Sequence, residues 1–165
     1  DGRLINKILN IFISNNINII DPRVLLKENI CYKKNNNISK FNKSLTSKMI
    51  KEYFFLAKKY GESDKGQAVI VANKKVILSE DRNGTDYLIM KFKTLNIQTS
   101  AYLIKVSKPN QDLRVDLPTI GPKTIQNIVK AGLQGLIVEN KKTFVENPFL
   151  TFKIIKEKKL FFHVF

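Results

Sequence analysis

The stretch AYLIKVSKPNQDLRVDLPTIGPKTIQNIVKAGLQGLIVE, residues 101–139, contains two β-rich runs separated by a charged loop and a helix-like segment. The first run covers residues 101–106 and the second covers 136–139, and both are rich in branched apolar side chains. Between them, Pro122 is typical of a helix start and Gly132 of a helix stop. The order strand, helix, strand predicts an α/β fold with parallel strands.

The rest of the chain continues this alternation. Residues 66–79 (GQAVIVANKKVILS) predict a β-hairpin, because two Val/Ile-rich runs flank a short polar turn. The other expected elements are helices at 3–13, at 47–60 with Ser47 as N-cap, at 85–93 with Thr85 as N-cap and at 148–158 after Asn147, strands at 17–20 and 160–164, and a long polar loop at 28–46. We therefore expect a single α/β domain over residues 1–165, with a mostly parallel mixed sheet flanked by helices and one β-hairpin.

Composition places the chain among globular proteins. Its 165 residues suit one domain, and 43% hydrophobic residues beside 26% charged residues are enough for a buried core. The first residue is Asp1 and not Met, which suggests a fragment or a processed chain. No signal peptide is visible, no apolar run approaches the ~18 residues of a membrane span, and the single Cys31 excludes an internal disulfide. We expect a cytoplasmic protein in a reducing compartment.

The net charge of +15 has two explanations. A polyanionic partner, such as nucleic acid, an anionic membrane or a phosphorylated ligand, would favour it. A general Lys, Asn and Ile bias explains it as well, and we prefer this explanation because the lysines are scattered along the chain. Since only four of the 29 basic residues are arginines, Arg114 in the charged loop is more informative than the many lysines.

The charged loop KPNQDLRVDLPTIGP, residues 108–122, follows the carboxyl end of a strand, where α/β sheets bind ligands. Asp112 and Asp116 would face one way on a helical turn, whereas an extended backbone would add Arg114 to their face. Either arrangement suits Mg²⁺, with Arg114 and Lys108 holding phosphoryl oxygens beside a helix N-terminus. A plainer explanation stays open, in which Asp116 caps a turn and Asp112 pairs with Arg114 on the surface.

Two residues outside this loop have both a functional and a structural explanation. Asp86 could join a ligand site, but it also complements the dipole of a helix that Thr85 caps, and we prefer this second explanation. Gln67 either reaches a ligand or opens the hairpin strand, and here too the structural explanation is the simpler one.

Four further polar residues are expected to have no catalytic role. Glu80 and Asp81 end a strand, so we expect both to be solvated. His163 lies on the last strand without a second histidine for a metal site. Cys31 lies in a polar loop without a nearby histidine to activate it.

Several segments together resemble one known family. Residues 108–139 follow the pattern KPxQDxRxDxPxxG, then a helix, AGLxG and a strand. DKGQAVIV at 64–71 and NGTDYLI at 83–89 resemble the family motifs DxGQxVVV and EGTDxMI, and DGRLINKILNIF at 1–12 resembles GDDxLLRxI. The chain thus resembles the C-terminal domain of the LpxI-type UDP-2,3-diacylglucosamine pyrophosphatases. It departs from them at Asn83, which replaces the acidic residue of EGTD and puts any role of that carboxylate in doubt.

The resemblance implies a hydrolase of lipid A biosynthesis in Gram-negative bacteria. Members cleave the pyrophosphate bond of UDP-2,3-diacylglucosamine with Mg²⁺ and water, giving UMP and lipid X (2,3-diacylglucosamine 1-phosphate). They also carry an N-terminal domain, which we do not recognise in this chain, and hold the substrate between the two domains. The implied partners are this UDP-linked lipid, the N-terminal domain of the same polypeptide and, peripherally, the cytoplasmic face of the inner membrane, while oligomerisation stays open.

The resemblance also assigns roles to residues. It makes Asp116 the expected metal and catalytic carboxylate, with Asp112 as a second ligand or orienting group and Arg114 neutralising phosphate charge. The expected substrate-binding residues are Lys108, Gln111, Thr119, Gln67 and Thr85, and the expected metal ligands are Asp116, Asp112 and Asp86.

Two alternatives from other classes remain. The chain could be a basic module that binds nucleic acid or an anionic membrane, or a degenerate, non-catalytic copy of the same domain. Nucleic-acid binding would need lysines clustered around aromatic platforms. Phenylalanines such as Phe54 and Phe92 fall instead at core-like positions, so we expect no nucleic-acid partner.

Overall fold

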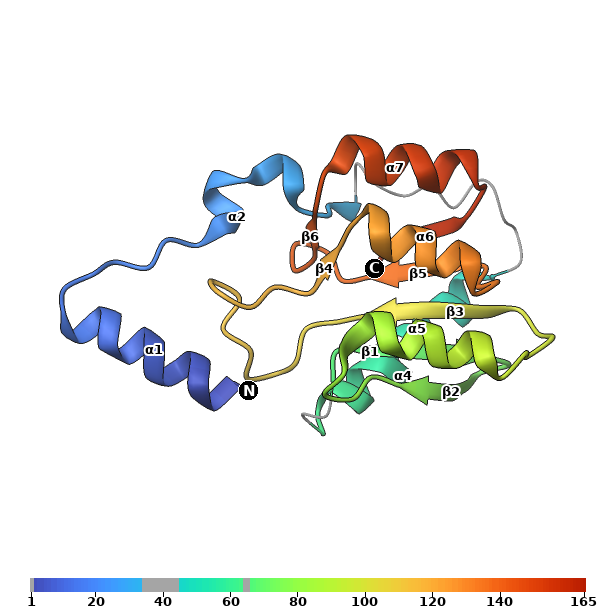
Figure 1. Ribbon diagram of the computed structural model, residues 1–165, viewed down its shortest axis with the longest axis horizontal. Helices are drawn as coiled ribbons and strands as arrows, with labels where there is room; N and C mark the ends of the chain where they lie inside the picture. The colour runs from blue at the N-terminus through green and yellow to red at the C-terminus, as the bar shows by residue number, and fades with distance from the viewer. Residues whose placement is uncertain (1, 34–44, 64–65) are drawn as a thin grey trace.

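The computed structural model describes residues 2–33, 45–63 and 66–165 and shows α-helices packed on both faces of a five-stranded sheet (Figure 1). The strands are β1 (Ala68–Ala72), β2 (Lys75–Ser79), β3 (Ala101–Lys105), β5 (Gly135–Val138) and β7 (Phe161–Val164). Their order is β2-β1-β3-β5-β7, with β1 antiparallel to both neighbours and β3, β5 and β7 mutually parallel. The predicted mixed, mostly parallel sheet with one hairpin is confirmed.

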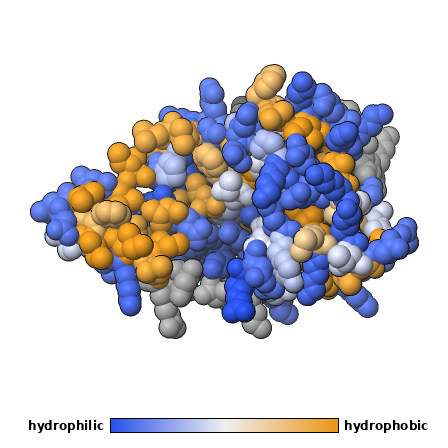
Figure 2. Space-filling model, in the orientation of Figure 1, coloured by the Kyte–Doolittle hydropathy of each residue, from blue (hydrophilic) through white to orange (hydrophobic). Residues whose placement is uncertain are grey.

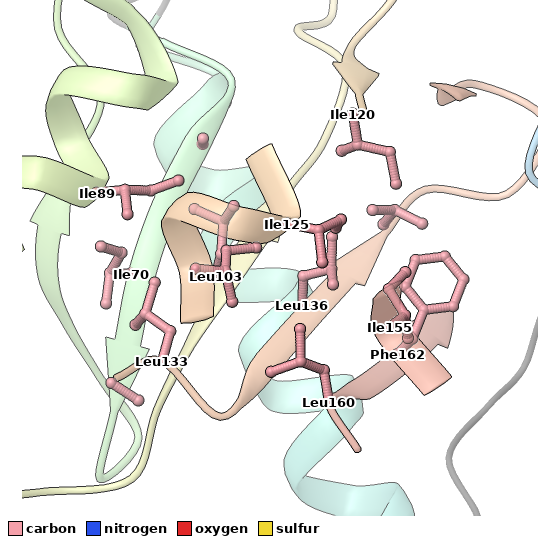
Figure 3. Close-up of a cluster of buried hydrophobic side chains, with 14 of the residues drawn as sticks. Ile70, Ile89, Leu103, Ile120, Ile125, Leu133, Leu136, Ile155, Leu160 and Phe162 are labelled. Carbon is pink, nitrogen blue, oxygen red and sulfur yellow. The ribbon is translucent and has the colours of Figure 1, made fainter. Parts of the chain in front are cut away.

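Helices cover the two faces of this sheet unequally. Helix α4 (Ser47–Gly61) covers one face, and α5 (Gly84–Thr94), α6 (Pro122–Lys130) and α7 (Pro148–Glu157) cover the other. The strand side chains alternate between the two layers: Val69 packs with the α4 cluster, whereas Ile70 and Leu103 join the cluster under α5, α6 and α7 (Figure 3). Because β1, β3 and β5 are buried on both faces, these strands are nearly continuous apolar runs in the sequence, whereas the edge strand β2 is more exposed.

Local chemistry explains where the helices begin. Asn147 accepts a hydrogen bond from the Leu150 N–H at 3.2 Å and so caps α7, as predicted. Helix α4 is capped by Thr46 and not by the predicted Ser47, because the Thr46 hydroxyl accepts from the Met49 N–H at 3.2 Å. Two good capping side chains are adjacent here, and only the backbone geometry decides between them.

One prediction of local structure is wrong, and one small sheet was not predicted. Residues 17–20, expected to form a strand, have no regular secondary structure, and the described residues offer them no partner strand. The sequence also gave no sign of a second, two-stranded parallel sheet of β4 (Thr119–Ile120) and β6 (Phe144–Val145), because two-residue strands carry no readable period. Residues 34–44 of the expected loop and the first two residues of the 64–71 motif lie outside the described residues.

The N-terminal part stands apart from the sheet. It contains α1 (Gly2–Ser14), α2 (Pro22–Leu25) and the 3₁₀ helix η1 (Lys27–Asn29), and α1 projects away from the sheet at the left of Figure 1. Apolar side chains gather on the surface over this end of the molecule (Figure 2). The exposed ones on α1 are Leu4, Ile8, Ile11, Phe12 and Ile13. Among the described residues, no helix is both long and apolar enough to cross a membrane.

Candidate active site

The candidate site lies at the carboxyl end of β3. Lys105 is the last residue of this strand, and the charged loop leaves the sheet directly after it. The helices α5 and α6, which follow β2 and this loop, both begin on the same side (Figure 1). The loop that was predicted to hold the catalytic residues therefore lies at the edge of the sheet where α/β proteins bind their ligands.

The loop forms a turn between its two aspartates. The N–H groups of Val115 and Asp116 donate to the Asp112 carbonyl oxygen at 3.1 and 2.9 Å, so the backbone is turned and not extended. Arg114 forms an ion pair with the same residue, with Nη2 to Oδ2 at 2.7 Å and Nε to Oδ1 at 3.0 Å. The side-chain hydrogen bond from Arg114 lowers the pKa of the Asp112 carboxyl. The surface pairing of Asp112 with Arg114, left open by the sequence, is confirmed.

Asp116 differs from Asp112 in its surroundings. It is half-buried, and we find neither a hydrogen bond nor an ion pair to its carboxylate from the described residues. Its charge instead acts on the ammonium group of Lys105. The two aspartates of the turn therefore interact with different cations, and the Asp116 oxygens keep their capacity to accept.

Lys105 is the residue that the sequence analysis missed. It is only 6% exposed, and its Nζ donates to Thr85 Oγ1 at 2.8 Å. The Thr85 hydroxyl in turn donates to Glu80 Oε1 at 2.5 Å. Burial lowers the pKa of the Lys105 ammonium, and the charges of Glu80, Asp86 and Asp116 act in the opposite direction. A single lysine inside an otherwise apolar strand was the available sequence signal.

The contacts among Lys105, Thr85 and Glu80 correct two predictions. Thr85 does not cap α5 with its side chain, because its hydroxyl is engaged by Glu80 and Lys105. Glu80 is not solvated but 6% exposed, and its second oxygen accepts from the Gln67 N–H at 2.7 Å. The neighbouring Gly66 permits this approach, since a Cβ there would lie 2.7 Å from the Glu80 carbonyl oxygen.

The predicted substrate-binding residues lie in two places. Gln111 links the loop to the hairpin, because its Nε2 donates to Gln67 Oε1 at 3.3 Å while its Oε1 accepts from the Lys108 N–H at 2.9 Å. These residues therefore come together with Glu80 at the same edge of the sheet. Thr119 is exposed on β4, and its hydroxyl donates to the Leu117 carbonyl at 3.0 Å.

Asp86 lines a groove between α5 and α6. Its oxygens accept from Lys123 Nζ at 2.8 Å and from Asn127 Nδ2 at 3.0 Å. The hydrogen bond from Lys123 is the main reason why the pKa of the Asp86 carboxyl is lowered. The groove has a volume of about 510 Å³ and is also lined by Tyr87 and Met90.

A second charged cluster, which the sequence analysis also missed, joins β3 to β5. Glu139 directly follows β5 and is 7% exposed. One carboxylate oxygen accepts from the Ser107 N–H and from the Ser107 hydroxyl, both at 2.8 Å, and the other faces Lys58 at 3.2 Å and Lys142 at 2.9 Å. We call Lys58, Ser107, Glu139 and Lys142 the Glu139 cluster. It fixes the start of the charged loop to the neighbouring strand.

The positions of these carboxylates bear on the expected Mg²⁺ site. In the described parts of the chain, no three His, Cys, Asp or Glu side chains come together as a ready-made metal site. Magnesium, however, usually binds through one or two carboxylates and keeps waters and substrate phosphates as its other ligands. The uncommitted carboxylate of Asp116 fits that mode, whereas Asp112 and Asp86 already accept from cations.

Cys31 and His163 both lie in buried surroundings. The expectation that Cys31 lies in a polar loop is wrong, because its side chain is completely buried in the hydrophobic core, and this burial raises the pKa of its thiol to about 12. The ring of His163 stacks on Phe161, with 6.3 Å between ring centroids, and burial lowers the pKa of its imidazole.

Comparison with known proteins identifies the family. Residues 36–163 match the family described as the LpxI C-terminal domain. The chain is also similar to the UDP-2,3-diacylglucosamine pyrophosphatase LpxI of Caulobacter vibrioides, with 36% identity over 97 residues. This match covers 54% of the chain and 35% of that relative, so the chain spans about a third of the length of the curated relative it matches. Because this match covers most of the chain, including Lys105, the charged loop and the Glu139 cluster, the chain belongs to the LpxI family through this C-terminal domain.

Proposed function

We propose that the chain is the catalytic domain of a hydrolase that cleaves UDP-2,3-diacylglucosamine to lipid X and UMP in lipid A synthesis. The observation that carries this proposal is the position of Asp116. Its uncommitted carboxylate lies in the loop that resembles the family's longest motif, at the carboxyl edge of the sheet and within the matched region. The named relative supports the substrate, because its name specifies that nucleotide-linked lipid.

The reaction replaces one phosphorus–oxygen bond with another. The water oxygen bonds to the phosphorus on the sugar side, the bond from that phosphorus to the bridging oxygen breaks, and UMP leaves with the bridging oxygen. The two protons of the water are shared between the products and the solvent. Such reactions depend mostly on positioning and on neutralising the charge of the phosphoryl oxygens.

The residues of the loop have different proposed roles in this reaction. We assign Asp116 to holding Mg²⁺ and orienting the attacking water. A bound Mg²⁺ would polarise phosphoryl oxygens and lower the pKa of a coordinated water. Arg114 and Lys108 offer positive charge at the loop surface, and Asp112 holds the Arg114 guanidinium in place by its two-oxygen contact. Asp86 is a further ligand only if Lys123 releases it.

Gln67, Gln111 and Thr119 complete the substrate side of the proposal. The contact between the two glutamine side chains ties the loop to the hairpin and places polar groups next to Glu80. Thr119 is exposed near the start of α6, where N–H groups at the helix end favour an anion.

The wider setting is also a proposal. A cytoplasmic enzyme that releases a lipid product would work at the inner membrane. A domain preceding the matched region would cover the charged loop and enclose the substrate between the two domains. The exposed apolar side chains of α1 are a surface that such a neighbour or a membrane would bury.

The test is hydrolysis by the complete natural protein that contains this chain. We expect UMP release from UDP-2,3-diacylglucosamine with Mg²⁺, loss of release with EDTA, and recovery when Mg²⁺ is returned. A folded protein that releases no UMP under any of these conditions contradicts the proposal. In that case, a degenerate domain or a basic module for nucleic acid or anionic membrane becomes the better explanation, and a salt-dependent loss of binding distinguishes the latter.

A further inference from the structure

Lys105 is a buried cation with unused hydrogen-bonding capacity. Its ammonium group has three N–H donors, and in the described part of the chain it donates only to Thr85 Oγ1. No described carboxylate forms an ion pair with it, although the residue is more than nine-tenths buried. Buried charges are usually paired, so a buried ammonium with free donors indicates that another anion completes its surroundings.

The neighbouring carboxylates do not fill this role. Glu80 accepts from the Thr85 hydroxyl and from the Gln67 N–H, and it acts on Lys105 through its charge and through Thr85, without a direct contact to the ammonium group. Asp86 accepts from Lys123 and Asn127. Asp116 remains, and it acts on Lys105 through its charge without a direct contact. These three groups favour a protonated Lys105, but they leave its donors open.

The position of Lys105 suits a phosphoryl ligand. It is the last residue of β3, at the start of the charged loop and at the carboxyl edge of the parallel strands. Its ammonium group donates to the Thr85 hydroxyl, which in turn donates to Glu80, so these two hydrogen bonds fix its side chain from one side. A cation held in this way needs little reorganisation when negative charge develops next to it.

We propose that Lys105 is a catalytic residue whose ammonium group donates to a phosphoryl oxygen of the pyrophosphate, and that Thr85 and Glu80 are positioning residues for it. This inference rests on the proposed function for its substrate, but it also predicts binding of inorganic pyrophosphate without turnover. The simplest competing explanation is a cation that only stabilises the fold. That explanation predicts no change in pyrophosphate affinity when the charge is removed from a folded protein.

The experiment compares Lys105→Met with Lys74→Met in the complete natural protein. Lys74 pairs with Glu52, away from the loop, and is 59% exposed in its side chain, so the second variant removes the same charge elsewhere. We expect Lys105→Met to lower kcat by about 10²- to 10³-fold, a typical cost of removing one preorganised donor. Pyrophosphate binding, measured by calorimetry, should weaken by about tenfold or more. Lys74→Met should change neither quantity.

Two further variants test the positioning role. Thr85→Val removes the hydroxyl that contacts Lys105, whereas Thr85→Ser keeps it. We expect Thr85→Val to lower kcat and weaken pyrophosphate binding, and Thr85→Ser to restore both. A stabilising role alone would move the unfolding midpoint without this rescue of pyrophosphate affinity. If Lys105→Met does not fold, pyrophosphate titrated into the unmodified protein should still shift the NMR signals of the Lys105 side chain.

The outcomes separate the two proposals. An active protein in which folded Lys105→Met hydrolyses substrate and binds pyrophosphate as well as Lys74→Met overturns the inference and leaves the proposed function standing. Unshifted Lys105 signals at saturating pyrophosphate overturn it too. Pyrophosphate binding that depends on Lys105, in a protein that does not hydrolyse the UDP-linked lipid, supports the inference and contradicts the proposed function.

Discussion

Two acidic residues at the same edge of the sheet, Glu139 and Asp116, have opposite surroundings. Glu139 is buried and receives hydrogen bonds or ion pairs from Ser107, Lys58 and Lys142. Asp116, in the loop after β3, has neither kind of contact among the described residues. The comparison separates a carboxylate that holds the fold together from one that remains available for a ligand.

The difference follows from how proteins treat buried polar groups. A buried carboxylate without partners is costly, so a structural one is surrounded by donors. The Glu139 cluster meets this requirement and fixes Ser107 at the start of the charged loop. The loop can then present Asp116 on a rigid base, because its first residues are tied to β5 and its centre is closed by the Asp112 turn.

The largest effect on stability is expected at the Glu139 cluster. Glu139→Gln removes a buried charge while Lys58 and Lys142 remain, so we expect the free energy of unfolding to fall by about 3 kcal/mol. Urea denaturation followed by circular dichroism measures this change. Glu157→Gln is a matched control, since Glu157 is exposed and faces Lys153 at 3.9 Å. A loss no larger than that of the control would show that Glu139 does not stabilise the fold.

The same cluster should make stability depend on pH. Burial raises the pKa of the Glu139 carboxyl, but the hydrogen bonds from Ser107 and Lys142 and the charge of Lys58 lower it overall, below its ordinary value of 4.5. A lowered pKa in the folded state means that the ionised group stabilises the fold above about pH 4.5 and that this contribution is lost as pH falls further.

The stability difference between the unmodified protein and Glu139→Gln should therefore be constant from about pH 7 to pH 5 and shrink below about pH 4.5. Denaturant titrations at a series of pH values measure it. A difference that grows on acidification would contradict the assignment of Glu139 as an ionised, well-partnered group.

A smaller effect is expected for the ion pair of the loop. Arg114 is exposed, so its pairing with Asp112 should contribute little to stability. We expect Asp112→Asn to leave the unfolding midpoint almost unchanged and to lower hydrolysis moderately by releasing the Arg114 side chain. Arg114→Lys keeps the charge but loses the two-oxygen contact, and it should lower hydrolysis to a similar extent. Full activity in both variants would remove this pair from the proposed site.

The smallest effect is expected at Cys31, which lies beside the Glu139 cluster. Its N–H donates to the Thr143 carbonyl at 3.0 Å, and the Thr143 hydroxyl donates to the Glu139 carbonyl at 3.0 Å. Since burial raises the pKa of this thiol to about 12, we expect no reaction with a thiol reagent at pH 8 in the folded protein. Rapid labelling in the native state would show that this region opens readily and is not a rigid base.

The sequence allowed the fold to be predicted better than the site. The hairpin, the parallel strands and the helix from Pro122 follow from apolar periods and turn residues, which are local signals. The burial of Glu80, Lys105 and Glu139 does not, because it depends on elements that meet only after folding. A lysine within the apolar run 101–106 was a usable signal that the sequence analysis did not use.

The prediction about residues 17–20 was wrong for a related reason. A run of apolar residues indicates a strand only if a neighbouring strand can pair with it, and the described residues provide none there. The same reasoning applies to α1, because an apolar helix face is buried only where another element packs against it, and several apolar side chains of α1 are exposed. By contrast, the Asp112–Arg114 pair could be anticipated, because it needs only two residues of separation.

The measurement that tests the comparison most directly is a joint determination of kcat and unfolding midpoint for Asp116→Asn and Glu139→Gln in the complete natural protein. We predict that Asp116→Asn loses about 10³-fold or more in UMP release while keeping its unfolding midpoint. Glu139→Gln should instead lose stability and retain most of its turnover per folded molecule. Full turnover in folded Asp116→Asn, or a large stability loss in that variant, would contradict the assignment of Asp116 as the ligand-binding carboxylate of this domain.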